Sequence, residues 1–542
     1  MRKTLFFVLA LPFFWVVGFS RSLSLNQIIE NKIEAGIQNH SISADGVVLY
    51  AQDLIADYYE LNDYAPVWRN KKNFKELMAN LEDAYNEGLM PGDYHLDRIK
   101  RLIDETKGNN ADPNKLADRD LLMTDGLFIY GKDLILGKVD QSKIRPGWDV
   151  PTNELPGNGD SLLYAALENK DLTGLLNSLK PDNFMYVHLR NGLKHYREIA
   201  KNGGWPKIPE GQVLKPGMKD KRVLAIRDYL EITGDLPVSV KSENDSINDD
   251  EVVKAVKEFQ FRHNLNQDGV IGKGTLGAMN VTVEERIDDI RVNMERARWV
   301  MHHLPDDFLV VNIAGYNVRR VINDSIVYYS RAIVGKQYHE SPIFKGKMRY
   351  IVLNPTWTLP HSIATKETLP KLQKNPNYLT EKNMIIMDRS GKEIDPSTID
   401  FNKLSQNNFP YIVRQTAGPH NALGQVKFIF PNKYSVYLHD TPSRSLFANE
   451  KRAFSHGCIR LDKKWELLID LMGEPDVWNM DKINEVLASG KTTRVNLKNP
   501  IDIVLLYWTA GADKQDKLYF NKDVYGRDAA VLKELDKPFA RP

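Results

Sequence analysis

A single cysteine, Cys458, occurs among the 542 residues, so no intrachain disulfide can hold the fold together. Hydrophobic cores must do so instead, and the 42% of apolar residues supply enough material for several of them. At roughly 150 residues per domain, a chain of this length is expected to form three or four units. The same composition argues against a collagen-like or largely disordered chain.

Charge and ligand spacing argue against two classes of function. Lysine and arginine total 73 against 71 aspartate and glutamate residues, which leaves no basic excess for a nucleic-acid partner. One cysteine cannot build a cysteine-based zinc site, and no His-Glu-x-x-His string occurs. We therefore expect no metal and no other cofactor.

The N-terminus follows the pattern of a secretory signal peptide, which we assign to residues 1–24. Two basic residues precede an uncharged apolar run from Leu5 to Phe19, and small residues follow up to Ser24. The run is shorter than the roughly 20 apolar residues of a membrane-spanning helix, and it contains Pro12. We expect cleavage near residues 20–24 and export, with an uncleaved anchor as the alternative.

An exported thiol without a partner is open to oxidation, so Cys458 is either buried and inert or functional. Its neighbours, in the string Ser455-His456-Gly457-Cys458, favour a function. Asp462 is expected to cap a following helix, whose dipole just after the cysteine would favour a thiolate. Gly457 permits a tight turn in which its own N–H and that of Cys458 could form an oxyanion hole.

A base for this thiol is expected upstream. Residues 434–439 alternate as in a half-buried strand, which places Tyr437 and His439 on one polar face. His439 would end this strand within reach of a loop cysteine, so it is the candidate general base. His456 lies two residues from Cys458, and we expect it to shape the turn or donate a hydrogen bond. Tyr437 or His456 could add an oxyanion contact.

The segment from His439 to Arg460 resembles the active-site signature of the YkuD-type L,D-transpeptidases. In that family a histidine is followed, after a variable loop, by Ser/Thr-His-Gly-Cys, an apolar residue and arginine or asparagine. The resemblance implies cysteine acyl transfer on peptidoglycan stem peptides. It makes Cys458 the nucleophile and His439 its base, and Asp440 would offer its backbone carbonyl to the imidazole.

Three residues are candidates for binding the substrate. Arg460 could meet a peptide carboxylate bidentately, although an arginine near a helix start is often structural. Trp357 could line a donor or acceptor groove or belong to the core. Ser455 belongs to the same set as part of the signature turn.

The architecture is also predicted to resemble the larger Gram-negative, YcbB-like members of this family. Residues 308–334 are expected to form a β-meander, and residues 348–354 a further strand. Asp249 or Asp250 should cap a helix with Val252, Val253, Val256 and Phe259 on one face. This helix and the turn at Asp268-Gly269 resemble the helical peptidoglycan-binding domain, although a polar stretch at 240–250 leaves its sugar binding open.

The predicted fold class is therefore multidomain α+β, with a mostly β YkuD-type catalytic domain. The expected units are a signal peptide (1–24), a mainly helical N-terminal scaffold domain (25–210), a small peptidoglycan-binding-like domain (211–285), the catalytic domain (306–497) with a capping insertion at about 361–410, and a C-terminal tail (498–542) that packs on the scaffold.

The resemblance implies an L,D-transpeptidase that forms three-to-three crosslinks through a cysteine acyl-enzyme on tetrapeptide stems. Two alternatives stay open, namely a cysteine L,D-carboxypeptidase of the same fold and a non-catalytic peptidoglycan-binding envelope protein. The expected partners are peptidoglycan stem peptides and glycan, together with envelope synthases. Carbapenem-type β-lactams are expected to acylate Cys458, and the expected location is the periplasm, at the inner membrane if the signal is uncleaved.

Overall fold

The computed structural model describes residues 23–144, 148–149, 164–165, 171–238, 246–302 and 304–539. The signal peptide lies outside the described residues except for its last two positions, and Ser24 there caps the first helix. Among the described residues, no helix combines the length and the apolar character that crossing a membrane requires.

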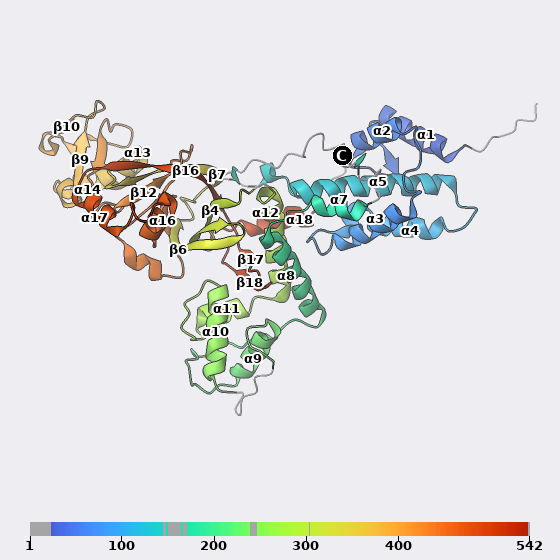
Figure 1. The fold of residues 1–542 in the computed structure, drawn as a ribbon, viewed down its shortest axis with the longest axis horizontal. Helices are drawn as coiled ribbons and strands as arrows, with labels where there is room; N and C mark the ends of the chain where they lie inside the picture. Colours follow the sequence, from blue (N-terminus) through green and yellow to red (C-terminus); the bar gives the residue numbers. More distant parts are fainter. Residues whose placement is uncertain are drawn as a thin grey trace, which may run out of the picture.

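Three parts of the chain extend from a shared centre (Figure 1). The N-terminal helices form one part, a small helical module forms the second, and a β-rich unit forms the third. The predicted multidomain α+β fold class is confirmed.

The N-terminal part is built around one buried helix, α5 (Pro113–Leu136). Asp112 caps it by accepting a hydrogen bond from the Asn114 N–H at 2.9 Å, and Gly137 ends it at a φ of +79°. Most of its second half is buried because neighbouring helices surround it. The other elements of this part are α1 (Leu25–Gln38), β1 (Ser43–Ala44), β2 (Val47–Val48), α2 (Gln52–Leu61), α3 (Lys71–Asp83), α4 (Leu96–Glu105), α7 (Leu172–Ser178) and α8 (Phe184–Lys201).

The small module contains α9 (Arg222–Ile232), α10 (Asp250–Arg262) and α11 (Lys273–Met279) around a core of its own. Asp249, rather than Asp250, caps α10 and accepts a hydrogen bond from the Val252 N–H at 3.1 Å. The predicted face of α10 is confirmed, since Val252, Val253, Val256 and Phe259 are all buried. Residues 240–245 of the polar stretch lie outside the described residues.

A helix to which sequence reasoning gave no role, α12 (Val283–Val300), lies at the centre where the three parts meet (Figure 1). Thr282 and Glu285 form a capping box at its start. Its second half is buried against α8, α5 and the C-terminal helix α18 (Asp528–Asp536). Arg298 and Glu295 of this half form a fully buried ion pair at 2.7 Å. Charged residues at buried positions hide the apolar period that would reveal this helix in the sequence.

The β-rich unit is a sheet that closes on itself. Its strands run in the order β12-β13-β15-β6-β5-β4-β16-β7, and β12 also pairs with β7. The predicted meander is confirmed as three consecutive antiparallel strands. The strands are β4 (Asp307–Asn312), β5 (Asn317–Ile322), β6 (Ser325–Gly335), β7 (Ile343–Leu353), β12 (Val426–Ile429), β13 (Leu438–His439), β15 (Ile459–Leu461) and β16 (Thr493–Leu506), with β3 (Trp148–Asp149) on β7 and β14 (Ala453–Ser455) on β6. Two helices, α16 (Lys464–Met472) and α17 (Met480–Ala488), separate β15 from β16.

The expected boundary at Leu497 is wrong. Strand β16 continues to Leu506 between β4, to which it is parallel, and β7, to which it is antiparallel. Residues 503–506 are therefore a buried part of the closed sheet, not a tail on the scaffold. The chain leaves the sheet only afterwards, as β17 (Ala510–Ala512), β18 (Leu518–Phe520) and α18. From there it reaches the N-terminal part, where Lys138 Nζ donates a hydrogen bond to the Leu535 carbonyl at 2.7 Å.

The insertion after β7 forms a cap with its own hydrophobic core, which includes Leu369, Ile386 and Phe401. A four-stranded sheet in the order β10-β9-β11-β8 supports it. The cap sheet therefore includes strands on both sides of the expected segment 361–410. The elements of the cap are β8 (Trp357–Thr358), α13 (His361–Ile363), the π-helical turn η3 (Ala364–Thr368), α14 (Leu369–Lys374), α15 (Tyr378–Glu381), β9 (Met384–Met387), β10 (Glu393–Ile394) and β11 (Ile412–Gln415).

Candidate active site

Parallel pairing of two very short strands, β13 and β15, brings the candidate base and nucleophile together. In this register Leu438 lies opposite Ile459, and His439 lies opposite Arg460. The Ile459 N–H donates to the Tyr437 carbonyl at 3.2 Å. Tyr437 therefore lies beside Cys458, and its ring centroid is 5.7 Å from that of His439, as expected for two residues on one face. The predicted strand over 434–439 is shorter than expected because Ser435 adopts a φ of +56°.

Cys458 precedes a strand, not a helix. Residues 459–461 form β15, and α16 begins only at Lys464 with Lys463 as its N-cap. The expected capping role of Asp462 is therefore wrong, because its carboxylate instead pairs with Arg331 and Arg444. The prediction that a helix dipole favours a thiolate at Cys458 is therefore wrong as well.

The thiol is only partly exposed and has polar neighbours. Its Sγ lies 3.8 Å from the Ser435 carbonyl oxygen, to which it donates, and Tyr437 is a second polar neighbour. Burial raises the pKa of Cys458, while Tyr437 and the positive charge of Arg460 oppose that rise. At neutral pH the cysteine is therefore a neutral thiol.

His439 is buried and held in one tautomer. Its Nδ1 lies 2.5 Å from the Asp440 carbonyl oxygen, which can only accept, so Nδ1 carries the proton. The lone pair is then on Nε2, the atom that a general base would use. Burial and the nearby Arg460 guanidinium lower the pKa of His439 to about 3, although the carbonyls of Asp440 and Leu423 act in the opposite direction.

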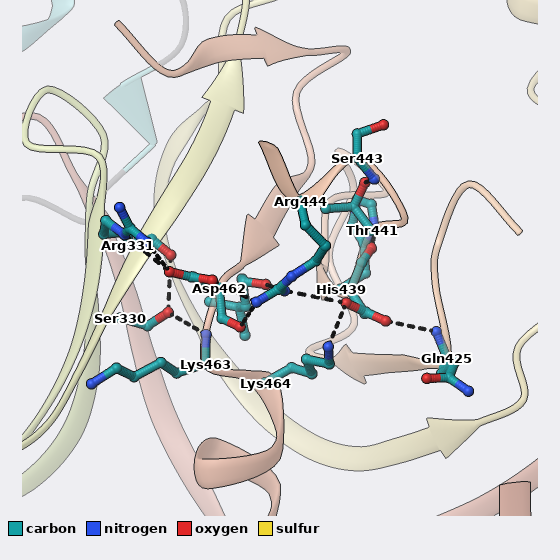
Figure 2. A network of polar contacts seen from close by, with 12 residues as sticks. Ser330, Arg331, Gln425, His439, Thr441, Ser443, Arg444, Asp462, Lys463 and Lys464 are labelled. Carbon is teal, nitrogen blue, oxygen red and sulfur yellow. Dashed lines mark hydrogen bonds and ion pairs between the residues drawn. The ribbon is translucent and has the colours of Figure 1, made fainter. Parts of the chain in front are cut away.

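Ion pairs fix the segment that carries this carbonyl. The Asp440 carboxylate accepts a hydrogen bond from the Gln425 N–H at 3.0 Å and lies 3.2 Å from Lys464 Nζ. Figure 2 shows Asp462 held between Arg331 and Arg444, beside the end of β13. Nothing in the local sequence pattern around His439 indicates this network, which joins Arg331 of β6 and Lys464 of α16 to the residues that follow β13 and β15.

One cavity of about 380 Å³ contains these side chains and lies between the sheet and the cap. His439, Cys458 and Arg460 line it from the sheet, and Trp357 and Glu367 line it from the cap. No group of three or more metal-ligating side chains occurs among the described residues. Two larger cavities, of about 790 and 840 Å³, lie elsewhere and contain none of these side chains.

Comparison with known protein families identifies the unit that carries this cavity. Residues 306–482 match the family model described as the L,D-transpeptidase catalytic domain, also named YkuD. The chain carries a YkuD-type L,D-transpeptidase domain. Residues 53–193 match a model described as a scaffold domain, and residues 219–279 match one described as a "Putative peptidoglycan binding domain".

Individual relatives were also found. A curated protein of Haemophilus influenzae described as "Putative L,D-transpeptidase" is 36% identical over 244 residues, which cover 45% of this chain and 48% of that protein. The chain thus spans about half the length of the curated relative it matches. A crystal structure of an L,D-transpeptidase (residues 123–326) from Xylanimonas cellulosilytica is 12% identical and covers 55% of this chain and 99% of that one. Its TM-score of 0.18 is too low to support an argument about the fold.

The signature turn of the L,D-transpeptidase domain differs in detail from expectation. The Gly457 N–H, expected in the oxyanion hole, donates to Ser455 Oγ at 3.1 Å and is therefore already used. Ser455 Oγ in turn donates to the Cys458 carbonyl at 2.5 Å, so this buried serine, which also lines the cavity, holds the turn. The Cys458 N–H has no such partner among the described residues and remains the backbone candidate for the oxyanion.

The remaining candidates of the domain lie at the cavity. His456 is exposed and bonds through Nε2 to Glu367 Oε1 at 2.7 Å, so its contact goes to the cap. Trp357 is half-buried and lines the cavity. Burial lowers the pKa of the Arg460 guanidinium, whose Nε has no hydrogen-bond partner among the described residues. Because Arg460 belongs to a strand, the helix-start explanation for it does not apply.

Proposed function

We propose that this protein is an L,D-transpeptidase that forms three-to-three peptidoglycan crosslinks through a thioester on Cys458. One observation carries the proposal: the chain's single thiol shares a cavity with an imidazole whose Nδ1 is fixed on a backbone carbonyl. A cysteine nucleophile needs a base that is held in one tautomer, and this arrangement supplies one beside the thiol.

Acylation begins with a tetrapeptide stem as donor. The Cys458 Sγ attacks the carbonyl carbon between the third and fourth residues, and the thiol proton passes to His439 Nε2. When the tetrahedral intermediate collapses, the C–N bond breaks and the proton moves from Nε2 to the departing amine. The terminal D-amino acid leaves, and the first three residues remain bound as a thioester.

The pKa shifts favour a general-base route over a preformed ion pair. Because burial lowers the pKa of His439 and raises that of Cys458, imidazole and thiol are both neutral before the substrate binds. Proton transfer must therefore accompany formation of the C–S bond. Arg460 supports the developing negative charge on sulfur, since no carboxylate among the described residues pairs with it.

The oxyanion of the intermediate needs donors that point into the cavity. The Cys458 N–H is the backbone candidate, and the Tyr437 hydroxyl next to the thiol is the side-chain candidate. A donor of this kind contributes on the order of 3 kcal/mol in comparable sites.

Deacylation transfers the acyl group to the side-chain amine of a diamino acid on a second stem. The amine nitrogen attacks the thioester carbon, gives its proton to His439 Nε2, and the C–S bond breaks with return of a proton to sulfur. Attack by water in place of the amine would make the protein a carboxypeptidase. The feature that favours the transferase is the cap, which lines the cavity on the side opposite the sheet, because a cover of this kind can exclude water when substrate is bound.

The setting of the reaction belongs to the same proposal. We place the protein in the periplasm, exported by its N-terminal segment, with peptidoglycan stems and glycan as substrate and envelope synthases as partners. The match to a peptidoglycan-binding model supports this setting. A β-lactam of the carbapenem type is expected to acylate Cys458, since its strained carbonyl presents the same electrophile to the thiol.

The test uses the chain from residue 25 onward with disaccharide tetrapeptides and product analysis by mass spectrometry. Crosslinked dimers that disappear in Cys458→Ala, and that fall about 10²–10⁴-fold in His439→Ala, would support the proposal. His195→Ala, an exposed histidine of α8, serves as the matched control and should keep full turnover. Tripeptides without dimers would favour the carboxypeptidase, and unchanged substrate with every variant would favour a binding protein.

A further inference from the structure

The nucleophile turn rests on the loop between β6 and β7, and one buried serine makes the contact. Ser341 Oγ donates to the Gly457 carbonyl at 2.7 Å and accepts from the Gly335 N–H at 3.0 Å. Ser341 is 0% exposed, so water does not compete for these bonds. The Gly457 carbonyl is thus fixed on the side of the turn away from the cavity.

This contact also fixes an N–H group. The Gly457 carbonyl and the Cys458 N–H belong to one peptide unit, which is planar and trans, so they point in opposite directions. Ser341 holds the carbonyl toward the protein interior, and the Cys458 N–H is therefore directed away from it. A hydrogen bond to the carbonyl also polarises the N–H of the same unit and makes it a better donor.

A tyrosine far along the chain holds Ser341 in place. The Tyr525 hydroxyl donates to the Gly335 carbonyl at 2.7 Å and accepts from the Ser341 N–H at 3.2 Å. One hydroxyl therefore joins both ends of the loop from Gly335 to Ser341. Tyr525 is 1% exposed and comes from the C-terminal segment, which we define as residues 507–527.

The C-terminal segment is itself rigidly built around Tyr525. The rings of Tyr525 and Tyr507 stack at 5.4 Å between centroids, and the Tyr525 N–H donates to the Tyr507 hydroxyl at 2.8 Å. The Tyr507 hydroxyl donates to Asp523 Oδ1 at 2.5 Å. Arg527 forms an ion pair with Glu340, the residue before Ser341, at 2.5 Å. The segment thus contacts the loop at two adjacent residues.

We infer that Ser341 and Tyr525 are positioning residues that align the Cys458 N–H as an oxyanion donor, with the C-terminal segment as their support. The inference goes beyond the proposed function in naming what orients the donor, and it rests on that function only for the natural substrate. The chemistry it predicts is general: reactions of Cys458 that pass through a tetrahedral oxyanion need this alignment. Reactions of the same thiol at a saturated carbon do not.

The test compares two reagents on the same thiol in the full exported chain. p-Nitrophenyl acetate acylates through a tetrahedral intermediate, whereas iodoacetamide alkylates by direct displacement, and Cys458→Ala supplies the background for both. Tyr525→Phe keeps the stack on Tyr507 and removes only the hydroxyl, and Ser341→Ala removes the bond to Gly457. Tyr59→Phe is the matched control, a buried hydroxyl of α2 that bonds Asp120 at 2.6 Å.

We expect Tyr525→Phe and Ser341→Ala each to slow acylation about tenfold, as the loss of one oriented hydrogen bond implies. Alkylation should stay within about twofold, and the double variant should lose little more than either single one, because both act on one peptide unit. With tetrapeptide, the loss should appear in kcat and not in KM.

Equal slowing of acylation and alkylation, or no difference from Tyr59→Phe, would overturn the inference. If Tyr525→Phe does not fold, as judged by thermal unfolding, Ser341→Ala alone decides the question. Failure of the wild-type chain to turn over tetrapeptide would refute the proposed function, yet the ratio of acylation to alkylation would still test the positioning role.

Discussion

Alkylation of Cys458 should accelerate steadily as the pH rises from 5 to 9, without a plateau near neutral pH. Only the thiolate reacts, and burial raises the pKa of Cys458. A cysteine that forms a thiolate–imidazolium pair would instead react at a nearly constant rate across this range. The pH profile therefore separates the two resting states.

The magnitude follows from the two pKa shifts. With the pKa of His439 lowered to about 3, its protonated fraction at pH 7 is on the order of 10⁻⁴, so an ion pair is not populated. An ordinary thiol with a pKa of about 8.5 is roughly 3% thiolate at pH 7, and a raised pKa places Cys458 below that value. Below its pKa, the rate of alkylation should rise about tenfold for each pH unit.

The assay is quenched labelling with iodoacetamide, followed by mass measurement of the intact chain. Because Cys458 is the only cysteine, every adduct on a thiol reports on this site. Cys458→Ala sets the background, and denatured chain gives the rate of the exposed thiol at each pH. A rate that is constant between pH 5 and pH 8, or an inflection near pH 6 that disappears in His439→Gln, would refute the neutral resting state.

Three further predictions concern the residues around the pair. Between pH 7 and pH 5, the free energy of unfolding of the wild type should fall by about 2 kcal/mol more than that of His439→Gln, because a histidine with a pKa of about 3 when folded and about 6.5 when unfolded favours unfolding as the pH falls below 6.5. Chemical denaturation at both pH values measures the two decreases, and equal decreases would contradict the prediction. Glu367→Gln should weaken the contact of the cap with His456 and raise KM for tetrapeptide several-fold with less change in kcat, whereas Glu381→Gln, also in the cap, should leave both unchanged. Gly424→Ala should lower both the melting temperature and kcat, because Gly424 has a φ of +63° and an added Cβ would lie 2.3 Å from Asp440 Oδ2. An unchanged melting temperature would contradict this prediction.

Local patterns indicated the candidate nucleophile and its candidate base, and they made the meander predictable. Cys458 and His439 were found from the signature between them, and the meander from turns between strands that follow one another in the chain. The core face of α10 was found in the same way, since its apolar residues repeat at helical spacing. Each of these features depends on residues that lie close together in the sequence.

Features that depend on distant contacts escaped prediction. Strand β15 has three residues and no pattern of its own, and it forms because β13 and β6 lie on either side of it. The prediction of a helix dipole at Cys458 was wrong for that reason. Ser341 and Gly457 are 116 residues apart, and Ser341 and Tyr525 are 184 residues apart. No spacing rule connects such pairs.

These long-range contacts also indicate which further parts of the chain the L,D-transpeptidase domain needs. The span that matches the L,D-transpeptidase model ends at residue 482, before β16 and before the C-terminal segment. Without β16, strands β4 and β7 would each lose the neighbour that closes the sheet. Without Tyr525, the loop under Gly457 would lose the hydroxyl that joins its two ends. The thiol and its candidate base thus lie within the matched span, whereas β16, which closes the sheet, and Tyr525, which supports the turn, lie beyond it.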